Sequence, residues 1–564
     1  MKGRTVFKPS IMFFLAICLP SLLEAQVFDE RMSDWPVDFT LRGTVIVCPQ
    51  PNPTEQVTRD FLRAGGKQPR VVGIFFDEPM NEPDTNTLRE DAESLYLYQR
   101  KSRAGELRLM EIGSSDTESQ TVKKALQNAT AVFLCATNPL DAEARQWLQM
   151  QAPEFHDCVQ RGGVILGCGD VGRLFGSREL VLPLPNSADS QATTRPGLNL
   201  LPDVILQTDF KGSGASVSLL NVLSRFPKAI GIGMEPQTCL ILRGRKVAAK
   251  GGGQLHFFTA ANSRVPVRKK AIGESKNSRF DPYQSLVDLT AWRRDAIDRT
   301  REIFPPANPA IPCVPKGTLM IIGGGGMPAG LMEQFIERAG GENAKLIYIP
   351  CTERETLSSR ESRLVQSWRQ KGVASADVFH TKDRLKADRD ELFLKPLAEA
   401  TGIFFGGGRQ WNFSDSYYGT KAHRLMKAVL ERGGVIAGSS AGASIQARYL
   451  ARANPLGNRD IMATGYERGG LGFISGVAID QHFTQRGRQA DMSALVNRYP
   501  QLLGIGIDER TAILVEKSRA EVIGEGDVYF YDRHQRSTKD RPDYLKLGAG
   551  KEYDLAKREV VLLD

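Results

Sequence analysis

The sequence predicts an α/β protein made of two related halves, each with a parallel sheet covered by helices. Three observations support this prediction. Short apolar runs alternate with helical patterns along the 564 residues, which is typical of βαβ units. Similar stretches recur about half a chain apart, and one proline-rich stretch separates the halves. A chain of this length exceeds one ordinary core, so we expect two or three domains.

The first 25 residues have the composition of an export signal. Lys2 and Arg4 precede the apolar run 11–19, and the stretch 23–25 is a suitable end for a cleaved segment. This run is short for a membrane span, and no later stretch approaches the required length. We therefore predict a signal peptide over 1–25 and an exported protein, periplasmic or extracellular, without membrane contact after cleavage. An uncleaved anchor is the alternative.

Charge and cysteine content exclude several classes of protein. The net charge of +9 is spread along the chain, which does not favour nucleic-acid binding. Seven cysteines would remain after signal cleavage, without paired spacing. This odd number argues against a disulfide framework and gives no zinc pattern, so the sequence predicts no metal site.

The first half is expected over residues 40–304. It opens with the apolar strand 43–48, and a second apolar run at 130–139 leads through a helical stretch to "QRGGVILGCGD" at 160–170. Its last part, 285–304, has apolar residues at helical spacing and predicts an amphipathic helix.

The second half is expected over residues 316–564, after a linker at 305–315. The stretch "IFPPANPAIPCVPK" contains five prolines, which exclude a helix or a central strand there. Beyond residue 470 strand-like runs become frequent, so we expect added antiparallel strands in this half. Its parallel strands are predicted at 318–322, 346–350, 402–405 and 434–438.

The two halves align without a gap over one long stretch. Phe133 aligns with Phe404 and Arg161 with Arg432 at the same offset. We infer an internal duplication with a period near half the chain.

The stretch "GSSAG" at 438–442 predicts a nucleophile elbow. An apolar strand precedes it and a helical pattern follows, and small residues flank the central Ser440. The backbone N–H of Ala441 would supply one oxyanion donor, and the glycine turn with Gly407 and Gly408 a second. An ordinary turn between strand and helix is the alternative interpretation.

An activated serine requires a base, and the chain has six histidines. His482 follows an apolar run and precedes a polar segment, as expected at a strand end that faces a cleft. His423 and His534 occur in polar stretches, so we expect them at the surface.

The group that orients the histidine remains open from spacing alone. "GIGIDERTAI" ends an apolar strand with Asp508 and Glu509, which are the leading carboxylates. Asp480 and Asp460 are further options. Such a carboxylate would hold the imidazole and stabilise its cationic form.

Four motifs in order, "FFGGGRQ", "GSSAGAS", "DQHFTQRGR" and "GIDERTA", resemble the cyanophycinase family of serine peptidases, peptidase family S51, related to aspartyl dipeptidase E. The resemblance covers 316 to about 545. It implies flavodoxin-like or glutamine-amidotransferase-like doubly wound domains in tandem. It also implies a triad of Ser440, His482 and Glu509, with no cofactor. The substrate contacts that it implies are Gln410, Asp480, Gln481, Arg486 and Arg488.

The pocket departs from the pattern of cyanophycin-cleaving members. Arg409 stands where the family usually has an acidic residue, and Gln489 and Asp491 stand where a further arginine is usual. We therefore expect a peptidase acting at aspartyl or β-aspartyl residues, with the actual substrate open. A binding or scaffold protein, or an amidase or esterase with the same triad, are the alternatives. A homodimer is expected by analogy.

The first half lacks these catalytic groups. By the repeat offset, Ser440 aligns with Gly169, which has no side chain, and Cys168 aligns with the preceding serine. His256 is the only histidine beyond this point in the half, and it lies in an apolar run. We expect a catalytically silent α/β domain.

Overall fold

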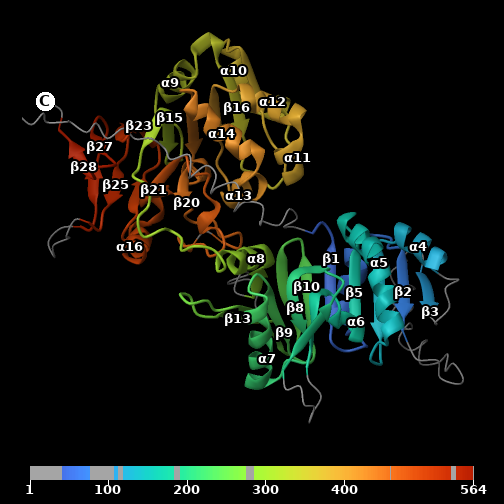
Figure 1. Cartoon of the computed structure of the whole chain (residues 1–564). Helices are drawn as coiled ribbons and strands as arrows, with labels where there is room; N and C mark the ends of the chain where they lie inside the picture. The colour runs from blue at the N-terminus through green and yellow to red at the C-terminus, as the bar shows by residue number, and fades with distance from the viewer. Residues whose placement is uncertain are drawn as a thin grey trace, which may run out of the picture.

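The structure is a computed structural model, shown in Figure 1. It describes residues 41–76, 107–111, 119–182, 191–274, 285–457, 459–534 and 542–562. The predicted signal peptide, 1–25, lies outside these residues. Among the helices of the described part, none combines the length and apolar character that a membrane crossing requires.

The larger sheet of the first half is parallel on one side and antiparallel on the other. Its strands are β1 (Thr44–Cys48), β2 (Val71–Phe75), β3 (Leu107–Glu111), β4 (Ala131–Ala136), β5 (Val164–Gly169), β10 (Thr238–Arg243), β11 (Lys246–Gly251) and β14 (Leu286–Asp288). They lie in the order β14-β11-β10-β1-β5-β4-β2-β3, and β1 to β5 pair in parallel. β1, β4 and β5 are buried along their whole length, as apolar strands covered on both faces must be.

A second sheet packs against the first. Its strands are β6 (Gly176–Val181), β7 (Thr193–Pro196), β8 (Leu201–Gln207), β9 (Ile230–Met234), β12 (Gln254–Thr259) and β13 (Arg268–Gly273), in the order β13-β12-β9-β8-β6-β7. Val45 and Ile165 of one sheet share a core with Val204 and Ile232 of the other. The helices of this half are α2 (Glu55–Ala64), α4 (Ser119–Asn128), α5 (Ala142–Gln160), α6 (Asp170–Arg173), α7 (Gly212–Arg225) and α8 (Leu289–Asp298).

The second half has the same plan. Its larger sheet contains β15 (Val314–Ile322), β16 (Lys345–Ile349), β17 (Ser375–Val378), β18 (Gly402–Phe405), β19 (Val435–Ser439), β23 (Thr511–Lys517), β24 (Arg519–Gly524), β27 (Glu552–Asp554) and β28 (Glu559–Val561), in the order β17-β16-β18-β19-β15-β23-β24-β27-β28. The four predicted parallel strands are all present.

A smaller sheet and the helices listed below complete the described part of this half. The strands are β20 (Ala447–Tyr449), β21 (Ile474–Gln481), β22 (Leu503–Ile507), β25 (Val528–Tyr531) and β26 (Leu545–Leu547). The helices are α9 (Leu331–Arg338), α10 (Arg363–Gln370), α11 (Arg384–Arg389), α12 (Glu391–Glu399), α13 (Trp411–Tyr417), α14 (Lys421–Glu431), α15 (Ala441–Ser444) and α16 (Gln489–Arg498). Ile321 and Ile436 meet Ile479 and Ile505 in the core between the two sheets.

The strand order agrees with the duplication that the sequence predicts. In the larger sheets, β3-β2-β4-β5-β1-β10-β11-β14 matches β17-β16-β18-β19-β15-β23-β24-β27 position by position. In the smaller sheets, β6-β8-β9-β12-β13 matches β20-β21-β22-β25-β26. The antiparallel strands expected only in the second half therefore occur in both halves, because β10 and β11 extend the first sheet as β23 and β24 extend its counterpart.

Three local expectations need correction. The stretch 285–304 is not one helix, because its start forms β14 and only Leu289–Asp298 is helical. Asp288 caps this helix by accepting a hydrogen bond from Ala291 N–H. His423 is not at the surface: its Nε2 lies 2.7 Å from Leu471 O, and the side chain is buried. The runs at 474–481 and 503–507 pair in parallel with each other.

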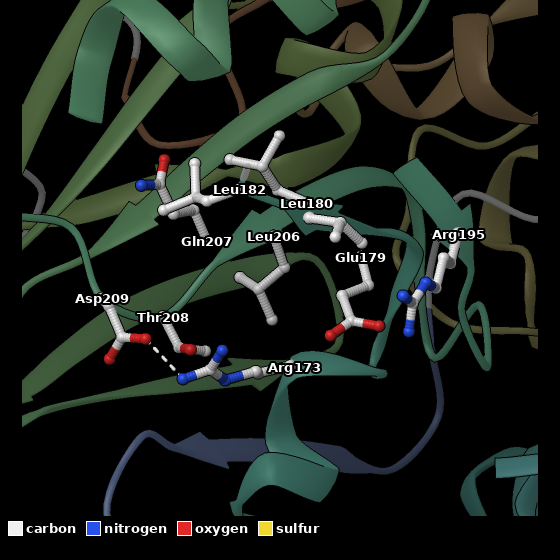
Figure 2. A pocket seen from close by; sticks show the side chains of 10 residues that line it. Arg173, Glu179, Leu180, Leu182, Arg195, Leu206, Gln207, Thr208 and Asp209 are labelled. Carbon is white, nitrogen blue, oxygen red and sulfur yellow. Dashed lines mark hydrogen bonds and ion pairs between the residues drawn. The ribbon is translucent and has the colours of Figure 1, made fainter. Parts of the chain in front are cut away.

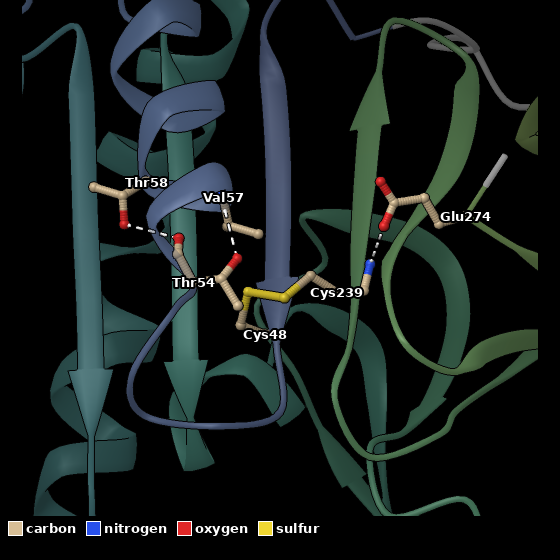
Figure 3. The surroundings of a disulfide bond; sticks show 7 residues. Cys48, Thr54, Val57, Thr58, Cys239 and Glu274 are labelled. Carbon is tan, nitrogen blue, oxygen red and sulfur yellow. Dashed lines mark hydrogen bonds between the residues drawn. A yellow bond between two sulfur atoms is a disulfide. The ribbon is translucent and has the colours of Figure 1, made fainter. Parts of the chain in front are cut away.

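One disulfide, Cys48–Cys239, joins β1 to β10 (Figure 3). The two strands are antiparallel neighbours with Val47 opposite Leu240, which brings the two cysteines together across the sheet. Their separation of 191 residues explains why spacing along the sequence gave no sign of the bond.

A buried ionic network joins the two halves. Arg245 of the first half donates to Asp288 from Nε at 2.5 Å and to Asp415 of α13 from Nη1 at 2.5 Å. Its guanidinium also donates to Tyr466 and lies over the ring of Trp411. Burial alone would raise the pKa of Asp415, but the nearby arginines lower it, so the carboxylate stays charged. Buried charges tolerate this environment only when paired.

The Arg245→Met substitution is expected to lower the free energy of unfolding by about 3–5 kcal/mol, because it leaves two buried carboxylates without their shared cation. Urea unfolding followed by tryptophan fluorescence measures this change.

Arg42→Met is the matched control, since Arg42 also joins the halves through Glu355, at 3.2 Å, but both side chains are exposed. We expect a change below about 1 kcal/mol there. Equal effects of the two substitutions would show that the buried network does not hold the halves together.

Candidate active site

Ser440 lies in a strained turn between β19 and α15. Its backbone has φ 57° and ψ −111°, a region that residues with a side chain rarely adopt. A Cβ atom on Gly438 would lie 2.1 Å from Gly442 O, and one on Gly442 would lie 2.1 Å from Phe405 O. The chain therefore needs glycine on both sides of this serine, and the predicted elbow is explained by these close approaches.

Ser440, His482 and Glu509 form a continuous chain of hydrogen bonds. Ser440 Oγ lies 2.8 Å from His482 Nε2, and His482 Nδ1 lies 2.6 Å from Glu509 Oε1. The arrangement fits a neutral imidazole that donates from Nδ1 to the carboxylate and accepts the serine proton at Nε2. Asp508 is turned elsewhere, since it accepts hydrogen bonds from the N–H and hydroxyl of Thr484 at 2.9 and 2.6 Å.

The surroundings keep His482 uncharged at neutral pH. Burial lowers the pKa of this imidazole, and the hydrogen bond to Glu509 raises it less, so the pKa lies below its ordinary value of 6.5. A neutral Nε2 can accept a proton, which a general base requires.

Three consecutive carbonyl groups at the end of β15 hold the three segments of the site. Ser440 N–H donates to Ile322 O at 3.0 Å, His482 N–H to Gly323 O at 2.9 Å, and Arg510 N–H to Gly324 O at 2.8 Å. Arg510 directly follows Glu509. The end of one strand thus sets the backbone positions of all three segments.

The glycine run after this strand lets its backbone reach the side chains of the site. A Cβ on Gly324 would lie 2.4 Å from His482 Cε1, and one on Gly325 would lie 2.4 Å from Glu509 Oε2. The strand predicted at 318–322 ends just before this run, whose role was not predicted. Four glycines in succession after a buried strand were the available signal, because such a run indicates close approach of the backbone.

Of the three predicted oxyanion residues, Gly407 and Ala441 lie beside the serine. A Cβ on Gly407 would lie 3.4 Å from Ser440 Cβ, and Ala441 directly follows the serine. Gly408 approaches Cys351, where a Cβ would lie 2.3 Å from Cys351 O. The Cys351 thiol donates to Arg409 O at 2.8 Å, and burial raises its pKa, so this thiol stays protonated.

The predicted substrate contacts fall into two groups. Arg486, like Arg409, is exposed beside the site. Asp480, Gln481 and Arg488 are buried in a network of their own, in which Arg488 Nη1 donates to Asp480 at 2.9 Å and to Gln481 Oε1 at 2.5 Å. Burial lowers the pKa of Arg488 to about 10, so it remains charged at neutral pH.

Arg452 extends this buried network and was missed by sequence reasoning. Its Nε donates to Asp480 at 2.7 Å and its Nη2 to Asp491 at 2.6 Å. Asp491, the unusual acidic residue after the third motif, is therefore paired within the protein. Gln410 is also buried and donates to Ala451 O at 2.8 Å. In the described part of the chain, no three His, Cys, Asp or Glu side chains gather as a metal ion would need.

The first half keeps the elbow without its chemistry. Gly169 has φ 62° and ψ −137°, close to the values of Ser440. Cys168 lies opposite Cys48 in the pairing of β5 with β1, and Ser439 lies opposite Ile322 in the equivalent pairing of β19 with β15. Phe210 packs on Gly233 as Phe483 packs on Gly506. The residue that precedes Phe210 is therefore structurally equivalent to the residue that precedes Phe483.

These equivalences give the first-half counterparts of the remaining two residues. Asp209 precedes Phe210 as His482 precedes Phe483, so these two residues are equivalent. Pro236 is equivalent to Glu509, because β10 pairs with β1 in the same register as β23 pairs with β15. His256 does not replace the base, because it pairs with Glu235 at 2.8 Å. All three positions of the Ser–His–Glu chain are thus changed in the first half.

The α/β fold and the hydrogen-bonded serine, histidine and glutamate define the class of a serine hydrolase. The family model of peptidase family S51 matches residues 319–523. The cyanophycinase of Synechococcus elongatus is 32% identical over 228 residues, which cover 38% of this chain and 68% of that protein. The cyanophycinase of Geminocystis herdmanii is 30% identical over 204 residues, 36% of this chain and 74% of that protein.

The chain belongs to peptidase family S51, whose members are serine-type peptidases. Among solved structures, a peptidase from an acI-B1 Actinobacterium is similar with a TM-score of 0.32 and 22% identity. The match covers 42% of this chain and 97% of that one. The family match lies entirely in the second half.

Gly324→Ala is expected to slow acylation of Ser440 by a fluorophosphonate about 100-fold or more, because the new methyl group would displace the imidazole of His482. Intact-mass measurement of the labelled protein over time gives the rate. Gly330→Ala is the control: its φ is also positive, at 75°, but the new methyl group would meet nothing within 4 Å. Equal labelling of both variants would contradict the proposed contact.

The labelling rate is expected to rise with pH and to reach half its maximum below pH 6.5, because the pKa of His482 is lowered and only its neutral form accepts the proton. Glu509→Gln should move the midpoint lower still and reduce the maximum rate by at least about 100-fold. A midpoint at or above pH 7 in the unsubstituted protein would contradict the effect of burial on this histidine.

Proposed function

We propose that this protein is an exported serine peptidase that hydrolyses peptide bonds at aspartyl or β-aspartyl residues through an acyl-enzyme on Ser440. The observation that carries the proposal is the Ser440–His482–Glu509 hydrogen-bond chain at a strained elbow. The pairing of Nδ1 with Glu509 leaves Nε2 facing the serine, as general-base catalysis requires.

In the proposed reaction, Ser440 Oγ attacks the carbonyl carbon while its proton passes to His482 Nε2. The N–H groups of Ala441, Gly407 and Gly408 stabilise the oxyanion of the tetrahedral intermediate. His482 then gives its proton to the departing amine, and the acyl group remains on the serine. A water molecule, deprotonated by His482, releases the acid product and restores the serine. Glu509 stabilises the cationic imidazole at each stage.

The preference for an acidic group is supported by the exposed guanidinium groups of Arg409 and Arg486. Arg409 directly follows the glycine turn, and Arg486 N–H donates to His482 O at 3.2 Å. Both residues therefore lie on segments that bound the site. Guanidinium groups bind carboxylates through paired, charge-assisted hydrogen bonds. Asp480 and Arg488 would act as supports of this wall from within the protein.

The proposal is tested with β-aspartyl dipeptides, α-linked peptides and simple esters. We expect turnover of the aspartyl peptides to be highest and to vanish in Ser440→Ala. Ser439→Ala is the matched control, because this neighbouring serine has the same size but lies outside the hydrogen-bond chain. Turnover that persists in Ser440→Ala would exclude the proposed nucleophile.

Arg409→Gln separates specificity from catalysis. It should raise KM for aspartyl peptides about tenfold with little change in the rate of fluorophosphonate labelling, whereas the exposed, distant Arg389→Gln should change neither. Higher turnover of esters or simple amides than of any peptide would favour an amidase or esterase with the same residues. A folded protein that neither labels nor turns over any of these would favour a binding or scaffold role.

Export is supported by the signal-like first 25 residues and by the Cys48–Cys239 disulfide, since such bonds persist in oxidising compartments. We expect protein recovered from the periplasm or medium to lack the first 25 residues. Its mass should rise by two hydrogens on reduction of the native disulfide. Full-length protein that is found only inside the cell, with all cysteines reduced, would overturn this part of the proposal. A homodimer remains a prediction of the family resemblance.

A further inference from the structure

The first half contains a small charged cavity beside the place that the active histidine occupies in the second half. Its volume is about 200 Å³. Figure 2 shows side chains of β6, β8 and α6 around it, with Asp209, the counterpart of His482, at one end. The charged lining residues are Arg173, Glu179, Arg195 and Asp209, and the aliphatic lining includes Leu180, Val181 and Leu206.

Three of the four charged lining residues named above are held by ion pairs. Arg173 is ion-paired with Asp209 and, at 3.2 Å, with Asp170. Arg145 reaches Glu179 Oε2 at 2.6 Å and Asp170 at 2.9 Å. These pairs fix the carboxylate of Glu179 from one side, and its side chain is buried.

One carboxylate oxygen and one guanidinium group remain open. Within the described part of the chain, neither Glu179 Oε1 nor the guanidinium of Arg195 has a hydrogen-bond or ion-pair partner. Glu179 and Arg195 are directly opposite in the register of β6 and β7, so their side chains leave the sheet on the same face. Figure 2 shows both extending toward the cavity.

This arrangement places a hydrogen-bond acceptor for a cationic group and a hydrogen-bond donor for an anionic group in one cavity, which also has an aliphatic lining. An amino group would donate to Glu179 Oε1, and a carboxylate would accept two hydrogen bonds from Arg195. The volume of about 200 Å³ restricts the ligand to a small molecule. We propose that the first half is a non-catalytic binding site for a zwitterionic amino acid or dipeptide.

The neighbouring positions explain why a bound peptide would remain intact. Gly169, Asp209 and Pro236 replace the serine, histidine and glutamate of the second half, so the described residues of this half contain no counterpart of the Ser–His–Glu hydrogen-bond chain. The first half would therefore bind the ligand without hydrolysing it. This inference does not depend on the activity proposed for Ser440.

The test uses the full chain with Ser440→Ala, so that no peptide is consumed. Isothermal titration calorimetry is performed with L-leucine, L-aspartate, L-arginine and glycyl-L-leucine. Acetate and n-butylamine, which carry only one of the two charges, are the reference compounds. We expect at least one zwitterion to bind saturably and at least tenfold more tightly than either reference compound.

Two substitutions locate the binding. Arg195→Gln and Glu179→Gln should each weaken it at least tenfold, whereas Arg63→Gln, an exposed arginine of α2, should leave it unchanged. Because Glu179 also pairs with Arg145, unfolding midpoints are measured for each variant. Arg195 is on an exposed edge strand, so its substitution remains informative if Glu179→Gln fails to fold. In chains that retain Ser440, Arg195→Gln should leave fluorophosphonate labelling unchanged.

Three results would overturn the proposal. These are the absence of saturable binding by all four zwitterions, equal binding of acetate, and unchanged affinity in Arg195→Gln. The last would place the binding outside this cavity.

Discussion

The active geometry depends on the last turn of chain after β15. Three successive carbonyl groups there receive the backbone N–H groups of Ser440, His482 and Arg510. Each of these residues has a positive φ, at 57°, 49° and 53°, which costs free energy for a residue with a side chain. The hydrogen bonds to β15 and the pairing of the flanking strands offset that cost. The sheet therefore keeps the serine, the imidazole and the carboxylate in register.

The same constraint explains how one half could lose its chemistry and keep its fold. Gly169 adopts nearly the backbone angles of Ser440, and glycine does so without the steric cost that serine bears. Gln237 keeps a positive φ at the place of Arg510. The elbow of the first half therefore lacks the strain that Ser440 bears, and the strand order of the two halves is the same around it.

Much of this organisation could be predicted from local sequence. Buried parallel strands such as 402–405 are continuous apolar runs, and the G-x-S-x-G turn has a steric signature that is visible in five residues. The choice of Glu509 over Asp508 came from the family resemblance, because adjacent carboxylates give no spacing signal. The structure turns only Glu509 toward the imidazole.

What sequence reasoning missed depends on contacts between distant residues. The burial of Asp480 and Arg488 follows from their pairing with each other and from the pairing of Asp480 with Arg452. The ring of His423 accepts a hydrogen bond from Gly419 N–H, just before its helix, and its Nε2 lies 2.7 Å from Leu471 O. A short pattern records none of these contacts, since each side chain alone is typical of a solvated surface.

The buried network around Arg245 has a consequence for the history of the chain. Asp415 and Tyr466, from the second half, both accept hydrogen bonds from Arg245 of the first half. A gene shortened to the second half would encode Asp415 without the two arginines that pair with it, together with an uncovered tryptophan face. Deletion of either half would therefore break this shared ion pair, and electrostatic interdependence favours retention of both halves.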